Sequence, residues 1–109
     1  MSISVGNVTT AASNVYVSTG STAITFMSLC NYTAGNVTAN VYVVPSGSSA
    51  GNANIILASI ELTALDTYQL YAGGEKLLLD SGDVVQVNAN VNNSITTVVS
   101  YTSIWWATT

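Results

Sequence analysis

The chain has 109 residues, of which 49% are hydrophobic and only 6% are charged, against a usual quarter. It carries one Lys, no Arg and no His, and its five acids give a formal net charge of −4. Binding to nucleic acid or to an anionic membrane surface draws on several cationic side chains, which a single Lys cannot supply. The lack of His excludes His-based catalysis and His-ligated metals. We therefore expect no enzyme, no cofactor and no nucleic-acid partner, and a single domain over residues 1–109.

The sequence also predicts where the chain is made. No apolar run approaches the roughly 18 residues of a membrane-spanning helix, so membrane insertion is not expected. Residues 1–7 lack the basic and apolar regions of a signal peptide. Cys30 is the only cysteine and cannot form an internal disulfide. Together these features predict synthesis and assembly in a reducing cytoplasm.

Candidate strands follow one another along the whole chain. Val, Ile, Thr and Tyr, which favour strands, are abundant, whereas strong helix formers are scarce. The clearest segments are 37–43 and 85–91, where apolar and polar residues alternate, so that each strand has one buried and one solvated face. In chain order the predicted strands are 3–9, 14–18, 22–33, 37–43, 55–62, 67–71, 77–79, 85–91 and 94–106.

Turn residues separate these segments at short intervals. About eight short strands with such spacing predict an all-β fold, a single antiparallel β-sandwich that is either jelly-roll-like or immunoglobulin-like. Segments 22–33 and 94–106 are long and apolar on both faces in parts, so we expect them to bend, to carry a bulge or to be covered on both sides. The predicted core consists of Val15, Val17, Val41, Val43, Ile56, Ile60, Leu70, Val85, Val87 and Val99.

Three acids, Glu75, Asp80 and Asp83, gather around one turn. A calcium site needs several oxygen ligands, and Asp-x-x-Asp with Gly82 between the acids lacks the dense ligand run of a calcium loop. We therefore predict that Asp80 and Asp83 cap a tight turn through bonds from side chain to backbone. No metal site is predicted.

Two further side chains that carry chemistry elsewhere are assigned structural roles. Glu61 lies between Ile60 and Leu62 at an outward position of a strand, which predicts a solvated side chain rather than half of a glycosidase carboxylate pair. Cys30 has no His or Lys beside it to activate the thiol, so we expect a buried structural cysteine. No catalytic residue is predicted.

Adjacent tryptophans near the end of the chain are its most pointed feature. In an extended segment Ile104 and Trp106 share one face, and Trp105 shares the other with Tyr101 and Ser103. Both rings can pack on their own domain, one can pack on a neighbouring subunit, or one can stack on a sugar. Because Trp is enriched at interface hot spots, we predict a subunit interface at Ile104, Trp105, Trp106 and Tyr101.

Several motifs resemble a known class of proteins. Residues 41–47 read Val-Tyr-Val-Val-Pro-Ser-Gly, residues 77–87 read Leu-Leu-Leu-Asp-Ser-Gly-Asp-Val-Val-Gln-Val, and Val-Val-Ser-Tyr follows at 98–101. Over residues 15–104 this pattern resembles small β-sandwich virion proteins of tailed bacteriophages, in which a strand ending in a Pro-Ser-Gly loop and a Gly-Asp turn into a Val-rich strand recur. The resemblance implies a structural component of the capsid, neck or tail, without catalytic residues.

Two functions compete at this point. An almost uncharged surface is poorly protected from self-association and suits permanent burial against neighbours. We expect a capsid cement or decoration protein of a bacteriophage virion, assembled in the host cytoplasm, that stabilises the shell through contacts with copies of itself and with major capsid, neck or tail subunits. The alternative is a neck or tail appendage protein that binds a glycan or receptor, with stacking candidates Tyr16, Tyr42, Tyr68, Tyr71 and Trp106.

Overall fold

The computed structural model describes residues 2–70 and 77–103 of the chain. All regular secondary structure in these residues is β, and they contain no helix that could cross a membrane. The strands agree with the predicted segments to within a few residues, and residues 71 and 104–106 of two predicted strands lie outside the described part. The bounds are β1 (Ser2–Asn7), β2 (Ser13–Val17), β3 (Thr22–Asn31), β4 (Val37–Val44), β5 (Ile55–Leu62), β6 (Thr67–Leu70), β7 (Leu77–Leu79), β8 (Val84–Ala89) and β9 (Ile95–Ser103).

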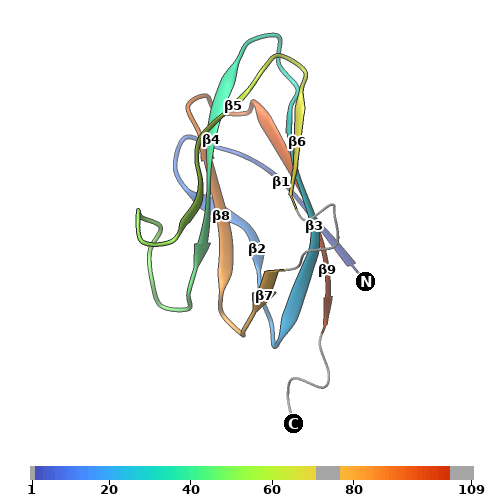
Figure 1. Ribbon diagram of the computed structural model, residues 1–109, viewed down its shortest axis with the longest axis vertical. Coiled ribbons are helices and arrows are strands. Elements are labelled where there is room, and N and C mark those ends of the chain that lie inside the picture. Colours follow the sequence, from blue (N-terminus) through green and yellow to red (C-terminus); the bar gives the residue numbers. More distant parts are fainter. Residues whose placement is uncertain (1, 71–76, 104–109) are drawn as a thin grey trace.

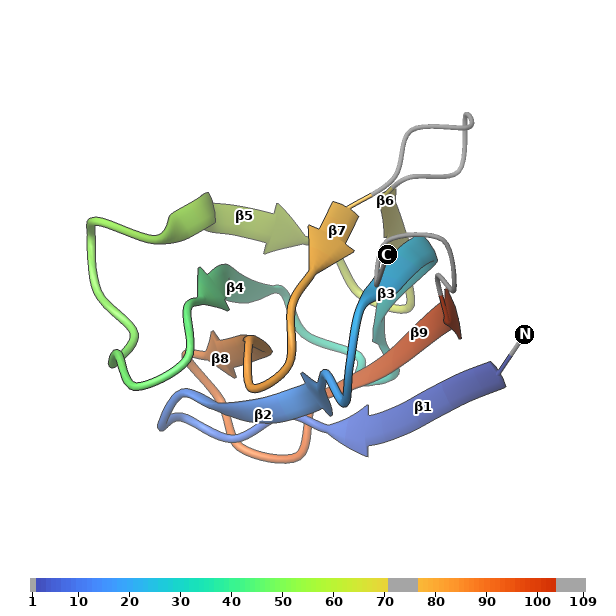
Figure 2. The same cartoon turned by 90° about the horizontal axis from the view of Figure 1, so that it is seen from below.

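These strands form two antiparallel sheets packed face to face, seen end-on in Figure 2. The five-stranded sheet has the order β1-β9-β3-β6, with β7 paired to the other half of β3, and the four-stranded sheet has the order β2-β8-β4-β5. The pairing is nested, because β1 pairs with β9, β2 with β8, β3 with β6 and β7, and β4 with β5 (Figure 1). A long hairpin rolled up in this way is a jelly roll, so the jelly-roll alternative is the one that the chain adopts.

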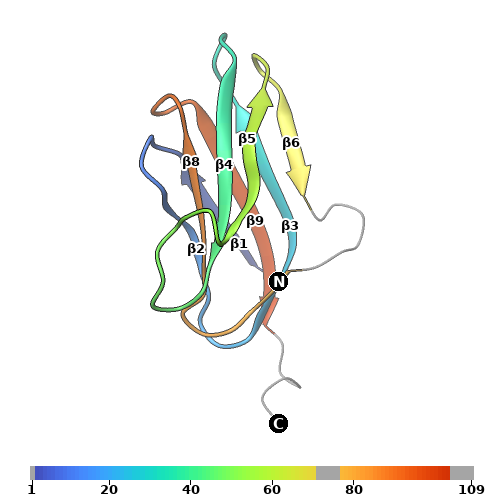
Figure 3. The same ribbon diagram turned by 60° about the vertical axis from the view of Figure 1, so that its left-hand side comes forward.

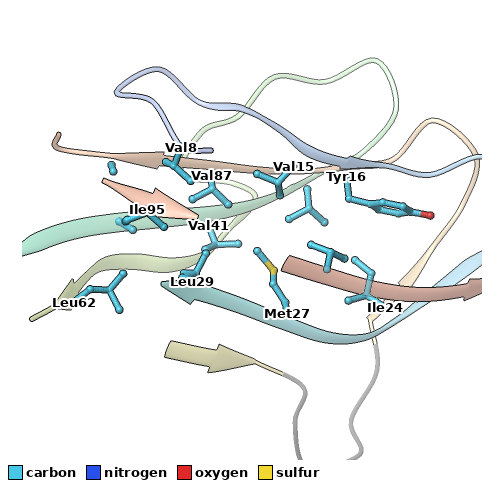
Figure 4. Packing of buried hydrophobic residues seen from close by; sticks show 14 of the residues in the cluster. Val8, Val15, Tyr16, Ile24, Met27, Leu29, Val41, Leu62, Val87 and Ile95 are labelled. Carbon is cyan, nitrogen blue, oxygen red and sulfur yellow. The ribbon is translucent and has the colours of Figure 1, made fainter. Parts of the chain in front are cut away.

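The hydrophobic core fills the space between the two sheets (Figure 4). Valines and other aliphatic side chains from every layer meet there, and no charged side chain is among the buried residues that the structure describes. Five of the predicted core residues are buried, two more are half-buried against the cluster, and the side chain of Leu70 lies outside the described part. The buried ones are Val15, Val41, Val85, Val87 and Val99, and the half-buried ones are Val43 and Ile60.

The prediction of a buried Val17 is wrong, because β2 carries a β-bulge. Between Asn14 and Tyr16 two residues of β2 advance against one residue of β8. The extra residue lets Val15 and Tyr16 both face the core, and the alternation resumes with the opposite phase. Val17 therefore turns outward and is 47% exposed.

The prediction of a buried Ile56 is wrong for the same reason. The four residues of β5 from Leu57 to Ile60 lie opposite only three residues of β4, from Ala39 to Val41, so β5 carries one extra residue. Ser59 lies within this irregular stretch and has a φ of 51°. Its N–H donates to Asn40 Oδ1 at 2.7 Å. Leu57 rather than Ile56 then packs on the core together with Ile60, and Ile56 is 41% exposed.

One buried amide ties together the loops at the end of the sandwich where β3 and β5 finish. Asn31 Nδ2 donates to the carbonyl oxygens of Gly35, Leu62 and Thr63 at 2.8, 3.0 and 3.1 Å. Its Oδ1 accepts from the backbone N–H and the hydroxyl of Thr33 at 3.0 and 2.7 Å. The side chain is fully buried, so these bonds fix both loops without competition from water.

The core assignment can be tested on β8. We expect Val87→Asp to lower the free energy of unfolding by about 3 kcal/mol or more, because Val87 is fully buried and the carboxylate would have no partner. Val91→Asp is the matched control, since Val91 is 46% exposed and should change stability by no more than about 0.5 kcal/mol. Urea denaturation measures both, and a normally stable Val87→Asp would mean that β8 has the opposite face in the core.

Candidate functional site

The outer face of the five-stranded sheet lacks charge and combines large apolar side chains with neutral polar ones such as Ser28, Thr96 and Ser100. Its apolar face consists of the outward side chains of Ile3, Val5, Val98 and Phe26. The register places Val5 next to Val98, and Ser100 lies between Ile3 and Phe26. Ile3 and Val5 are 64% and 63% exposed. None of the described residues of this sheet carries a charge.

Strand β1 has its small residues on the core side and its large apolar residues on the solvent side, the reverse of an ordinary amphipathic strand. Ser4 and Gly6 face inward, where the Ser4 hydroxyl donates to the carbonyl oxygen of Val15 at 3.0 Å. A Cβ at Gly6 would lie in ordinary van der Waals contact with the Thr97 hydroxyl oxygen, at 3.4 Å, so Gly6 lies directly against Thr97. The large apolar residues of β1 are thereby left on the solvent side. Packing in the core does not explain why Ile3 and Val5 are apolar, because they lie outside it. A contact with another molecule would explain it.

The strands β2, β8, β4 and β5 of the four-stranded sheet can be followed in Figure 3. The outer face of this sheet has the opposite character. Its amide face consists of Asn14, Gln86, Asn88, Asn40 and Tyr42, of which Tyr42 lies beside Gln86 in the register. Gln86 Nε2 donates to Asn14 Oδ1 at 2.7 Å, and Asn40 Nδ2 donates to Asn88 Oδ1 at 2.9 Å. Each amide NH₂ group has two hydrogens, so these pairs leave donors that a hydroxylated ligand can use.

The proposed stacking tyrosines do not come together on one surface. Tyr16 is buried in the core, and its hydroxyl donates to Thr22 Oγ1 at 3.2 Å. Tyr42 is half-buried on the amide face, whereas Tyr68 is 37% exposed on β6 of the other sheet. Tyr71 and Trp106, like Ile104 and Trp105 of the predicted interface, lie outside the described residues.

Tyr101, the remaining residue of the predicted interface, packs within the sandwich. It pairs with Ile24 across β3 and β9, it is half-buried against the core, and its ring centroid lies 4.5 Å from that of Tyr16. Cys30, expected to be buried, is half-buried on the outward side of β3. The interface at residues 104–106 stays a prediction.

The acidic turn between β7 and β8 is held by Asp83. Its carboxylate accepts from the backbone N–H groups of Ser46 at 3.0 Å and Asp80 at 2.9 Å, as predicted for a capping residue. Gly82 has a φ of 89°, and a Cβ there would lie 2.5 Å from the Ser46 hydroxyl oxygen. Glu75 lies outside the described residues, which contain no group of three or more His, Cys, Asp or Glu that could hold a metal ion. Glu61 is exposed on β5, as predicted.

A small apolar tip, formed by Tyr32, Leu65 and Val91, lies at the end of the sandwich that Asn31 organises. All three side chains are exposed. Leu65 also has a φ of 61°, a conformation that costs a residue with a side chain about 1 kcal/mol or more, and its N–H donates to the carbonyl oxygen of Thr33 at 3.1 Å. Sequence reasoning missed this residue, because no local pattern predicts a left-handed leucine.

Comparison of the chain with protein-family models, with curated proteins and with solved structures found no match.

The strain at Leu65 can be measured. We expect Leu65→Gly to raise the free energy of unfolding by about 0.5–1 kcal/mol, because Gly adopts a positive φ without steric cost. Leu65→Ala keeps the Cβ and should give no gain. Urea denaturation with an unchanged m value checks both variants, and a gain for Ala as large as that for Gly would show that the backbone of Leu65 is unstrained.

Proposed function

We propose that the protein is a structural component of a bacteriophage virion, a capsid cement or decoration protein that stabilises the shell through subunit contacts. The observation that carries the proposal is the apolar face. Ile3 and Val5 stand almost two-thirds exposed on a sheet whose described residues bear no charge. Large apolar side chains that stand exposed together on one face mark an interaction site.

The energetics of this face favour permanent contact. Covering Ile3 and Val5 would contribute about 1–2 kcal/mol each, from the usual value for burying an aliphatic side chain. The described strands of the five-stranded sheet carry no ionised group that would have to lose its hydration, so this gain is not offset by the cost of burying charge. Interfaces of permanent assemblies are depleted in charge in the same way.

The virion setting is supported by the sequence and by the fold. The motifs at residues 41–47, 77–87 and 98–101 resemble those of small virion proteins of tailed phages. The jelly roll is a fold of viral capsid domains and of lectins. It is therefore compatible with both candidate roles, and the apolar face favours the structural one.

The test is made on particles of a phage that encodes this chain. We expect purified particles to contain the protein, and particles made without it to release their DNA at a lower temperature. Ser28→Lys places a charge on the apolar face beside Val98, away from the β1 edge, and should abolish incorporation. Gln86→Lys adds the same charge to the amide face and should be incorporated normally. Absence of the protein from purified particles would overturn the proposal.

The second candidate, a neck or tail appendage protein that binds a glycan, is favoured by the amide face. Carbohydrate hydroxyl groups pair with amide donors and acceptors, and a tyrosine ring offers an apolar surface to a sugar. Tyr42, Asn40 and Gln86 present both features on one side of the four-stranded sheet.

This role predicts saturable binding to at least one glycan on an array. Tyr42→Ala should then lose binding at least about tenfold, a change of 1.4 kcal/mol. Tyr68→Ala, which removes a tyrosine from the other sheet, should bind as the wild type does. If the wild-type protein binds no glycan, the glycan-binding role is excluded and only the structural role remains.

A further inference from the structure

The edges of the two sheets are protected to different degrees. In the four-stranded sheet, the edge strand β2 carries a bulge, and the edge strand β5 carries two register shifts and the charge of Glu61. Opposite β1, the five-stranded sheet ends in two short segments, β6 of four residues and β7 of three. Bulges, charges and short strands are the usual means of preventing edge-to-edge pairing.

Strand β1 has none of these protections. Its six residues Ser2–Asn7 pair with β9 in an unbroken register and contain neither a charge nor a Pro. It lies at the margin of its sheet in Figure 2. Among the described residues, no strand pairs with its outer side.

The hydrogen-bond pattern fixes which backbone groups of β1 point outward. The Val8 N–H donates to the Ile95 carbonyl oxygen at 3.0 Å, which continues the β1–β9 ladder by one residue. In an antiparallel ladder alternate residues bond to the partner, so Gly6 and Ser4 also bond to β9. The N–H and C=O groups of Ile3, Val5 and Asn7 therefore face away from the sheet.

We propose that β1 pairs with β1 of a second copy of this chain, antiparallel and about a two-fold axis at Val5. In this register Val5 lies opposite its own symmetry mate, and Ile3 lies opposite Asn7 of the other copy. All the outward backbone groups of Ile3, Val5 and Asn7 are then used, because each of these pairs is a hydrogen-bonded one. The two five-stranded sheets join into one continuous sheet.

The occupant is a second copy because the edge is complementary to itself. A two-fold axis presents the same patch to both partners, and this patch has no charge that would repel its own copy. Six residues span only about 20 Å at roughly 3.4 Å per residue. Pairing along so short an edge buries less surface area than a standard protein–protein interface. The dimer is therefore weak in solution and becomes populated where copies are concentrated.

This inference rests on the proposed function, since copies of a shell protein are concentrated on the shell. The contact through the β1 edge and the contact through the apolar face nevertheless differ in direction. Edge pairing lies in the plane of the sheet, whereas the apolar face packs perpendicular to it. A contact that uses the face alone leaves the outward N–H groups of β1 open to water.

The test uses sedimentation of the full chain from micromolar to millimolar concentration. We expect a monomer–dimer equilibrium, with the dissociation constant raised about fivefold or more by Val5→Lys and likewise by Val5→Glu, because like charges directly opposite in a β pair repel. An equal mixture of the two variants should dimerise again. Val17→Lys, at an exposed position on the edge of the other sheet, is the matched control and should dimerise as the wild type does.

Hydrogen exchange separates edge pairing from face packing. On dimerisation the amides of Ile3, Val5 and Asn7 should gain protection, while that of Gly6 is protected in both states. A wild type that stays monomeric, a Val5→Lys dimer of unchanged affinity, or unprotected outward amides in the dimer would each overturn the inference. These results leave particle incorporation, and with it the proposed function, to be judged separately. Unfolding of Val5→Lys would contradict the exposed position of Val5 and would also overturn it.

Discussion

Strand register, including its bulges, is the constraint on which the rest of this structure depends. A two-layer sandwich of this size has one thin core, and each strand supplies it with alternate side chains only. One extra residue in β2 brings both Val15 and Tyr16 into the core, and one in β5 exchanges Ile56 for Leu57. β3 has a similar shift between Ile24 and Phe26, after which Met27 and Leu29 face inward. Each shift also decides what the outer face presents.

A chain with so few charges must satisfy its polar groups by neutral hydrogen bonds. Every buried side-chain nitrogen and oxygen that the structure describes has a partner. Side-chain amides satisfy many of the backbone groups where strands and loops become irregular. Asn31 donates to the loops after β3 and β5, and Asn40 accepts a hydrogen bond from the N–H of Ser59 at the bulge of β5. Asp83 is the carboxylate equivalent at the turn before β8. These bonds from Asn and Asp side chains to the backbone replace the ladder bonds that irregular segments lack.

The two outer faces follow from the same register and have different consequences. On the four-stranded sheet, the outward positions hold amides that bond across strands, and such a face is stable in water by itself. On the five-stranded sheet, β1 places Ser4 and Gly6 inside, next to Val15 and Thr97, and its large residues stand outside. The asymmetry makes one side of the domain a candidate for assembly and the other a candidate for contact with solvent or with hydroxylated ligands.

The sequence by itself determined the all-β class, the position of nearly every strand and much of the core, because period-two alternation and turn residues are local signals. It also determined the lack of charge on the apolar face, which is a matter of composition. The tertiary structure alone decided between jelly-roll and immunoglobulin-like pairing, since strand order depends on contacts between distant segments. It also decided the exposure of Val17 and Ile56, because a bulge appears only when a strand is measured against its partner. The outward direction of Ile3 and Val5 has the same origin: an alternating strand does not say which of its faces meets the core until its neighbours are in place.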